Sequence, residues 1–202
     1  MTQLPWNRSE LHAWAATEGE RDEQIAEASR LQGQRIEKVQ YFTLDYQNMD
    51  HVLPRMISDS LEWSDPSWRY DCFDCFDFYL QIDTEDQRSF TVGWDPPSES
   101  AGLWLREGAS HGVPFGSVAV WDVTASPRWA PLLGLVVSAV ECRYRTDVEL
   151  PGWHNELLTL TIDHQRVFVF LGDVASDQSQ EPSANSLMVM SDPAELPDWM
   201  SN

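Results

Sequence analysis

Two cysteines and three aspartates share the short segment 71–77, and these are the side chains best suited to chemistry. Cys72 and Cys75 have the C-x-x-C spacing found in zinc sites and in thiol–disulfide catalysts. A zinc ion would need two further ligands, and the chain has no second C-x-x-C pair and no H-x-x-x-H motif. A redox pair belongs at the start of a helix, whereas this pair leads into a predicted strand. We therefore interpret the cysteines as structural. A zinc site completed by Cys142 and a histidine is the alternative.

Histidines and glycines supply no further catalytic motif. None of the five histidines lies in a recognisable nucleophile, metal or phosphate motif. Gly108, Gly112 and Gly116 lie between predicted strands, without the helix N-terminus and the nearby lysine that a phosphate-binding loop uses. The only lysine is Lys38, far away in the sequence. We therefore expect no catalytic residues, no cofactor and no metal ion.

The acidic residues are the more informative group. Residues 59–99 contain eleven acids and two arginines, a net charge of −9. Paired carboxylates can bind a divalent cation or transfer protons, but the calcium-loop spacing D-x-[DN]-x-[DN]-G is absent. A solvated acidic face is one interpretation. A docking surface for a basic protein is the other, because tryptophans near the acids are typical of protein interfaces. The candidate contact residues are Asp71, Asp74, Asp77, Asp83, Glu85, Asp86 and Trp94.

The whole chain is acidic, like the segment 59–99. Its 202 residues include 33 acidic and 13 basic residues, giving a formal net charge of −20. Such a surface repels nucleic-acid phosphates and anionic membranes, and it favours a basic partner or simply maintains solubility. A hydrophobic content of 42% with ten tryptophans predicts a folded core. We expect a cytoplasmic protein, because the sequence shows no signal-peptide pattern and no apolar run that could span a bilayer.

Predicted β-hairpins must position these groups. Apolar and polar residues alternate over 76–82 and 89–94, and again over 157–162 and 166–171. Alternation with a period of two predicts strands with one buried face, and the short polar links predict hairpins. β-branched and aromatic residues predict further strands over 35–46, 101–106, 117–121, 136–144 and 186–190. We expect a polar loop over 174–185 and a tail over 191–202.

Two predicted helices precede the hairpins. The first covers residues 20–32, and Thr17 and Glu20 before it have the spacing of a capping box. The second is a short helix over 128–133. Each helix is followed by a glycine that can end it in a left-handed conformation, and Gly33 and Gly134 are 101 residues apart.

This recurrence predicts the fold class. We interpret the chain as one compact, β-rich α+β domain of antiparallel sheets, with internal duplication of a helix–strand–hairpin unit over about 20–95 and 126–173. Two such units would pack their sheets together to bury one apolar face of each. Coincidence among generic strand patterns is the alternative to duplication.

Charge, tryptophan content and the missing catalytic motifs favour a protein-binding function. We expect an inhibitor of the bacterial immunity-protein type that binds and neutralises a basic toxin or effector, such as a nuclease. Opposite charge raises the association rate, and carboxylates can occupy a pocket meant for phosphate. One alternative is a nucleic-acid mimic that blocks a DNA-binding or defence protein. A second alternative is an enzyme with dispersed catalytic residues in a cleft near 48–70 and 106–116. A third alternative is a structural or regulatory subunit.

Overall fold

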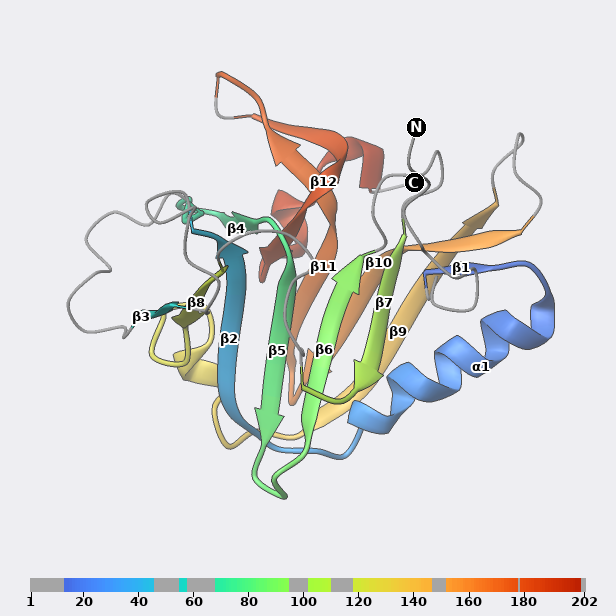
Figure 1. The fold of residues 1–202 in the computed structure, drawn as a ribbon, viewed down its shortest axis with the longest axis horizontal. Helices are drawn as coiled ribbons and strands as arrows, with labels where there is room; N and C mark the ends of the chain where they lie inside the picture. Colours follow the sequence, from blue (N-terminus) through green and yellow to red (C-terminus); the bar gives the residue numbers. More distant parts are fainter. Residues whose placement is uncertain are drawn as a thin grey trace.

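The computed structural model shows two mainly antiparallel sheets packed face to face, with one α-helix along their edge (Figure 1). The structure describes residues 13–45, 55–57, 68–94, 102–109, 118–146, 152–177 and 179–200. The predicted β-rich α+β class is therefore confirmed.

The first sheet carries the first predicted hairpin. Its strand order is β3-β8-β2-β5-β6-β7, and all neighbours are antiparallel except β3 and β8. The strands are β2 (Ile36–Leu44), β3 (Arg55–Ile57), β5 (Tyr79–Thr84), β6 (Ser89–Trp94), β7 (Leu103–Glu107) and β8 (Val118–Asp122). Strands β5 and β6 pair as the predicted hairpin.

The second sheet carries the second predicted hairpin. Its main order is β1-β10-β11-β12-β4, and β9 also pairs with β10. The strands are β1 (Trp14–Ala15), β4 (Phe73–Phe76), β9 (Val137–Thr146), β10 (Trp153–Ile162), β11 (Gln165–Val174) and β12 (Gln180–Met190). Strands β10 and β11 pair as the predicted hairpin.

One α-helix lies in the described part of the chain. Helix α1 (Glu18–Ala28) continues into the 3-10 helix η2 (Ser29–Leu31), so it begins two residues before the predicted start. Thr17 caps the helix as predicted, because its Oγ1 accepts a hydrogen bond from Glu20 N at 3.2 Å, and Gly33 has a φ of 86°. The Glu20 carboxylate accepts from Ala16 N at 2.7 Å instead of Thr17 N, so the reciprocal half of the predicted capping box does not form.

The other helices are single 3-10 turns. The predicted helix over 128–133 was wrong in extent, since only η3 (Ala130–Leu132) forms there. Pro131 lies within this turn and has no backbone N–H to continue a hydrogen-bonded helix. Near the C-terminus lie η4 (Pro193–Glu195) and η5 (Asp198–Met200).

The main core lies between the two sheets. Leu80 and Phe90 of the first sheet and Leu160 and Val169 of the second are all fully buried within it. A second cluster covers the opposite face of the second sheet, where Phe170 packs edge-to-face against Trp199 at 5.6 Å. The C-terminal turns are therefore held against this sheet by apolar contact.

Two predicted boundaries were wrong. The expected loop over 174–185 was predicted too long, because β12 already begins at Gln180 and pairs its polar half with the end of β11. Backbone hydrogen bonds form this pairing regardless of side-chain polarity. The predicted strand over 76–82 is interrupted after Phe76, so that β4 joins the second sheet while β5 joins the first.

Two turns meet where the sheets come together. Gly33 N donates to Val137 O at 2.8 Å, and Gly134 N donates to Ile36 O at 2.8 Å. The segments 33–36 and 134–137 are thus joined by reciprocal hydrogen bonds. This contact connects the start of β2 with the start of β9.

Candidate functional site

Asp74, a predicted contact residue, lies in the interior. It is 4% exposed, and it accepts hydrogen bonds from Tyr41 Oη at 2.7 Å and from Arg128 Nε at 3.0 Å. Trp129 Nε1 donates to the same tyrosine oxygen at 2.6 Å. These four residues come from β2, β4 and the segment before η3, so the network joins the two sheets.

Burial controls the protonation of this network. It raises the pKa of the Asp74 carboxyl, while the charge of Arg128 and the hydrogen bond from Tyr41 oppose the rise. Burial also raises the pKa of the Tyr41 hydroxyl, and the neighbouring Asp74 adds to that rise. Asp74 is therefore bound within the fold, and we do not include it in the docking surface proposed below.

The tip of the first hairpin carries three predicted contact residues. Asp83 Oδ1 accepts hydrogen bonds from Gln81 Nε2 at 2.8 Å and from Ser89 Oγ at 2.6 Å. Glu85 is exposed, and the structure gives its carboxylate no ion pair within the described residues. Asp86 accepts a hydrogen bond from Thr84 Oγ1 at 2.5 Å.

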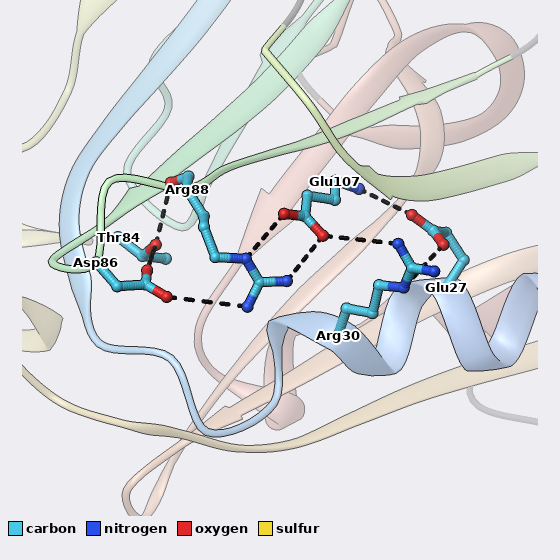
Figure 2. Close-up of polar contacts among 6 residues, drawn as sticks. All are labelled: Glu27, Arg30, Thr84, Asp86, Arg88 and Glu107. Carbon is cyan, nitrogen blue, oxygen red and sulfur yellow. Dashed lines mark hydrogen bonds and ion pairs between the residues drawn. The ribbon is translucent and has the colours of Figure 1, made fainter.

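Asp86 also begins a chain of charges that alternate in sign (Figure 2). The members in order are Asp86, Arg88, Glu107, Arg30 and Glu27. Arg88 binds Glu107 through two parallel hydrogen bonds of 2.9 and 2.8 Å, which raise the pKa of Arg88 and lower that of Glu107. The chain of charges links the hairpin to β7 and α1, and it pairs Asp86 with Arg88.

The remaining predicted residues lie near β4 and β6. Asp77 Oδ2 accepts a hydrogen bond from Leu44 N at 2.9 Å, and the carbonyl of Asp77 accepts one from Trp94 Nε1 at 2.8 Å. Asp71 is exposed. Among the seven predicted residues, Asp71 and Glu85 are thus the two exposed carboxylates for which the described structure shows no ion pair.

A pocket of about 670 Å³ lies where α1 covers the edge of both sheets. Its walls come from α1, β1, β7, β9 and β10, which Figure 1 shows converging on one side of the molecule. Three aromatic residues, Trp14, Trp104 and Tyr144, line the pocket beside four charged ones. Large rigid aromatic surfaces beside a cavity are typical of binding sites.

Three glutamates of α1 line this pocket. Glu20, Glu23 and Glu27 are three and four residues apart, a spacing that places them on one helix face. Glu20 Oε2 accepts a hydrogen bond from Ala16 N at 2.7 Å, and Glu27 pairs with Arg30 at 3.1 Å. Glu23 is exposed, and no described residue forms an ion pair or hydrogen bond with it. Glu23 is therefore the carboxylate most accessible to a ligand.

A β-bulge places Asn155 in the pocket. Residues Asn155 and Leu157 lie opposite Tyr144 and Arg143, so Glu156 is an extra residue in β10. Asn155 is 2% exposed, and its amide nitrogen can donate to Leu157 O at 2.9 Å and to Arg143 O at 3.1 Å.

Gln24 holds the pocket walls together. Tyr144 Oη donates to Gln24 Oε1 at 2.9 Å, and Gln24 Nε2 donates to Trp14 O at 3.2 Å. Burial raises the pKa of the Tyr144 hydroxyl, so the tyrosine stays neutral and donates. These bonds connect α1 to β1 and β9.

Cys142 lines the same pocket as a neutral thiol. Burial raises its pKa to about 11, so little reactive thiolate exists near neutral pH. Burial raises the pKa of Cys75 to about 12, while Cys72 is exposed. Within the described residues, no group of three His, Cys, Asp or Glu side chains could hold a metal ion.

Comparison of the chain with protein-family models, curated proteins and solved structures found no match. No helix among the described residues is long and apolar enough to cross a membrane. The cleft predicted near 48–70 and 106–116 falls largely outside the described residues, of which only 55–57, 68–70 and 106–109 belong to it. The pocket beside α1 is therefore the binding geometry from which we argue.

Sequence analysis did not find this pocket. The spacing of the three glutamates on the predicted helix was available as a signal, but the largest local excess of acids lay elsewhere, over 59–99. Asn155 and Tyr144 gave no signal, because a bulge and the pairing of β9 with β10 bring them together.

Proposed function

We propose that this chain binds and neutralises a basic protein, in the manner of an inhibitor or immunity protein. The observation that carries the proposal is the acidic face of α1 beside an aromatic pocket. Within its bounds, α1 contains five acids and one arginine, listed in sequence as Glu18, Glu20, Arg21, Asp22, Glu23 and Glu27. The net charge of −20 over the whole chain also favours a positively charged partner.

The two features have separate roles in binding. Carboxylates on an exposed helix steer a basic partner and raise its association rate, an effect that salt screens beyond about 8 Å at physiological ionic strength. Aromatic walls contribute affinity, because tryptophan and tyrosine bury large areas with little loss of side-chain entropy.

Affinity capture followed by binding kinetics tests this function. The immobilised full chain is exposed to a lysate of its native cells, and the captured protein is then purified and its binding measured in NaCl. We expect a basic partner whose association rate falls about tenfold between about 50 and 500 mM NaCl. A captured partner that is not basic, or association kinetics independent of salt, would contradict the proposal.

Two charge variants locate the interface. In one, three acids of α1 are neutralised by Glu18→Gln, Asp22→Asn and Glu23→Gln. In the other, the hairpin tip loses three through Asp83→Ala, Glu85→Ala and Asp86→Ala. We expect the α1 variant to lower the association rate more, because Asp83 and Asp86 are already hydrogen-bonded within the fold. The opposite order would place the interface at the hairpin tip.

We also propose that the two sheets contain copies of one unit. The order β2-β5-β6-β7 in the first sheet has the same antiparallel course as β9-β10-β11-β12 in the second. Gly33 N donates to Val137 O and Gly134 N donates to Ile36 O, so the second bond is the first with each residue replaced by the one 101 positions away. The first unit begins with α1, whereas the second begins with the short η3. On this interpretation, the binding helix belongs to one copy only.

A further inference from the structure

The pocket beside α1 combines aromatic walls with oxygen acceptors, and this combination identifies the chemistry of its occupant. We propose that it receives an arginine side chain of the basic partner. This inference rests on the proposed function, because it names the group through which that partner is anchored.

The walls fit a planar cation. Guanidinium groups stack on the faces of tryptophan and tyrosine, and they keep few water molecules when they do so. Trp14 and Tyr144 line the pocket from β1 and β9. The third aromatic residue, Trp104, shows the same chemistry within the chain, since the guanidinium of Arg106 lies over its ring at 4.2 Å.

The acceptor of the pocket fits a guanidinium. The carboxylate of Glu23 lies on the α1 side of the pocket without a described partner. A guanidinium can donate two parallel hydrogen bonds to one carboxylate, as Arg88 does to Glu107 elsewhere in the chain.

The net charge of the lining favours a cationic occupant. Three glutamates and one arginine line the pocket, and Glu27 is compensated by Arg30 at 3.1 Å. Among the remaining charges of the lining, Glu20 and Glu23 are negative and Arg106 is positive, which leaves one negative charge in excess. Cys142 and Tyr144 are neutral, because burial raises the pKa of both groups. The site therefore retains a negative charge that a single guanidinium would balance.

A titration with small arginine probes tests the pocket without the partner. Uniformly ¹⁵N-labelled full chain is titrated with N-acetyl-arginine methylamide, and with the lysine and citrulline analogues as probes of charge and shape. Citrulline has nearly the same shape as arginine but no charge. We expect the arginine probe to shift the Trp14 indole and Asn155 amide signals and to bind at least about fivefold more tightly than either analogue. Equal binding of citrulline or lysine, or shifts confined to other residues, would overturn the assignment.

Two single-charge variants provide the matched comparison. Glu23→Gln removes the accessible carboxylate from the pocket, and we expect about tenfold weaker binding of the arginine probe. Glu37→Gln removes the same charge from an exposed position of β2, outside the pocket lining, and should leave the affinity unchanged. Equal effects of both changes would show only a general influence of charge and would overturn the inference. Circular dichroism and the dispersion of the amide spectrum confirm that each variant is folded.

The two proposals fail in different ways. If a basic partner is captured but binds the Glu23→Gln variant as tightly as the unchanged chain, the arginine pocket is wrong and the neutralising function stands. If the arginine probe binds as expected but no basic partner is captured, the pocket stands and the neutralising function is wrong.

Discussion

At the scale of single residues, Asp74 shows how a charged side chain can be structural. In the sequence it belongs to an acidic run and was predicted to face a partner. In the structure it is bound by Tyr41 and Arg128, which are 33 and 54 residues away. Nothing near Asp74 in the sequence indicates either contact. The burial of this carboxylate could therefore not be predicted without the arrangement of the sheets.

The variant Arg128→Met should destabilise the protein in a pH-dependent way. Removing Arg128 from this buried ion pair leaves the Asp74 carboxylate with only Tyr41 and the charge of Arg69 to stabilise it. We therefore expect the free energy of unfolding to fall by about 3 kcal/mol near pH 7. The pKa of Asp74 is already raised by burial, and the loss of Arg128 would raise it further. Urea unfolding between pH 4 and pH 8 measures the effect.

The sign of the pH dependence follows from that raised pKa. A carboxyl whose pKa is higher in the folded state stabilises the fold below its unfolded pKa of about 3.9, and this contribution is lost as the pH rises through the folded pKa. The loss is larger in Arg128→Met, so its stability should approach that of the unchanged chain near pH 4. The double variant Arg128→Met with Asp74→Asn serves as the control and should lack this dependence. A deficit that is constant with pH would show that packing, rather than the Asp74 charge, accounts for the loss.

At the scale of elements, the local alternation of apolar and polar residues predicted the hairpins but not the contacts between distant strands. The pairs β5–β6 and β10–β11 follow from alternating side chains and short links. The bulge at Glu156 and the pairing of β4 with β12 depend on contacts between distant segments. Since the bulge is what brings Asn155 opposite Tyr144, the candidate pocket shares this dependence on long-range pairing.

The two glycine turns should contribute equally to stability. Gly33 and Gly134 have φ values of 86° and 69°, in the left-handed region that alanine avoids. An added Cβ would meet nothing within 4 Å at Gly33, and only Glu85 at 3.9 Å at Gly134. We therefore expect Gly33→Ala and Gly134→Ala each to lower the free energy of unfolding by about 1 kcal/mol, through backbone strain alone.

Gly19 of α1 provides the matched control for these turns. Its added Cβ would meet only Thr17 Oγ1 at 3.9 Å, and alanine favours the helical backbone. Gly19→Ala should thus be neutral or stabilise the protein by up to about 1 kcal/mol. Chemical denaturation of the three variants checks the set. A large loss at only one of the two turns would show that the turns are not equivalent.

At the scale of the whole molecule, the sign of the charge was predictable and its location was not. Composition alone gives a net charge of −20. The acids of 59–99 looked like the docking surface, but Asp74, Asp83 and Asp86 are bound within the fold. Helix α1 contributes acids beside an aromatic pocket because β7 and β9 place an edge of both sheets beneath it. The position of that helix on the sheets is a property of the fold.

The net charge also predicts opposite effects of salt on folding and on binding. Repulsion within a chain of charge −20 destabilises the compact state, and salt screens it, so the free energy of unfolding should rise by on the order of 1 kcal/mol between about 0.05 and 0.5 M NaCl. The same screening should weaken a complex with a basic partner. Urea unfolding at pH 7 measures the first effect, because urea adds no ions.

Attractive pairs within the fold respond to salt in the other direction. Arg88 and Glu107 form two hydrogen bonds at the surface, and screening weakens such pairs. The double variant Arg88→Gln with Glu107→Gln removes this pair without changing the net charge, so salt should stabilise it at least as strongly as the unchanged chain. If NaCl instead destabilises both proteins, repulsion does not dominate the folded state. The acidity of the chain would then be balanced within its own structure, which would remove the electrostatic argument for a basic partner.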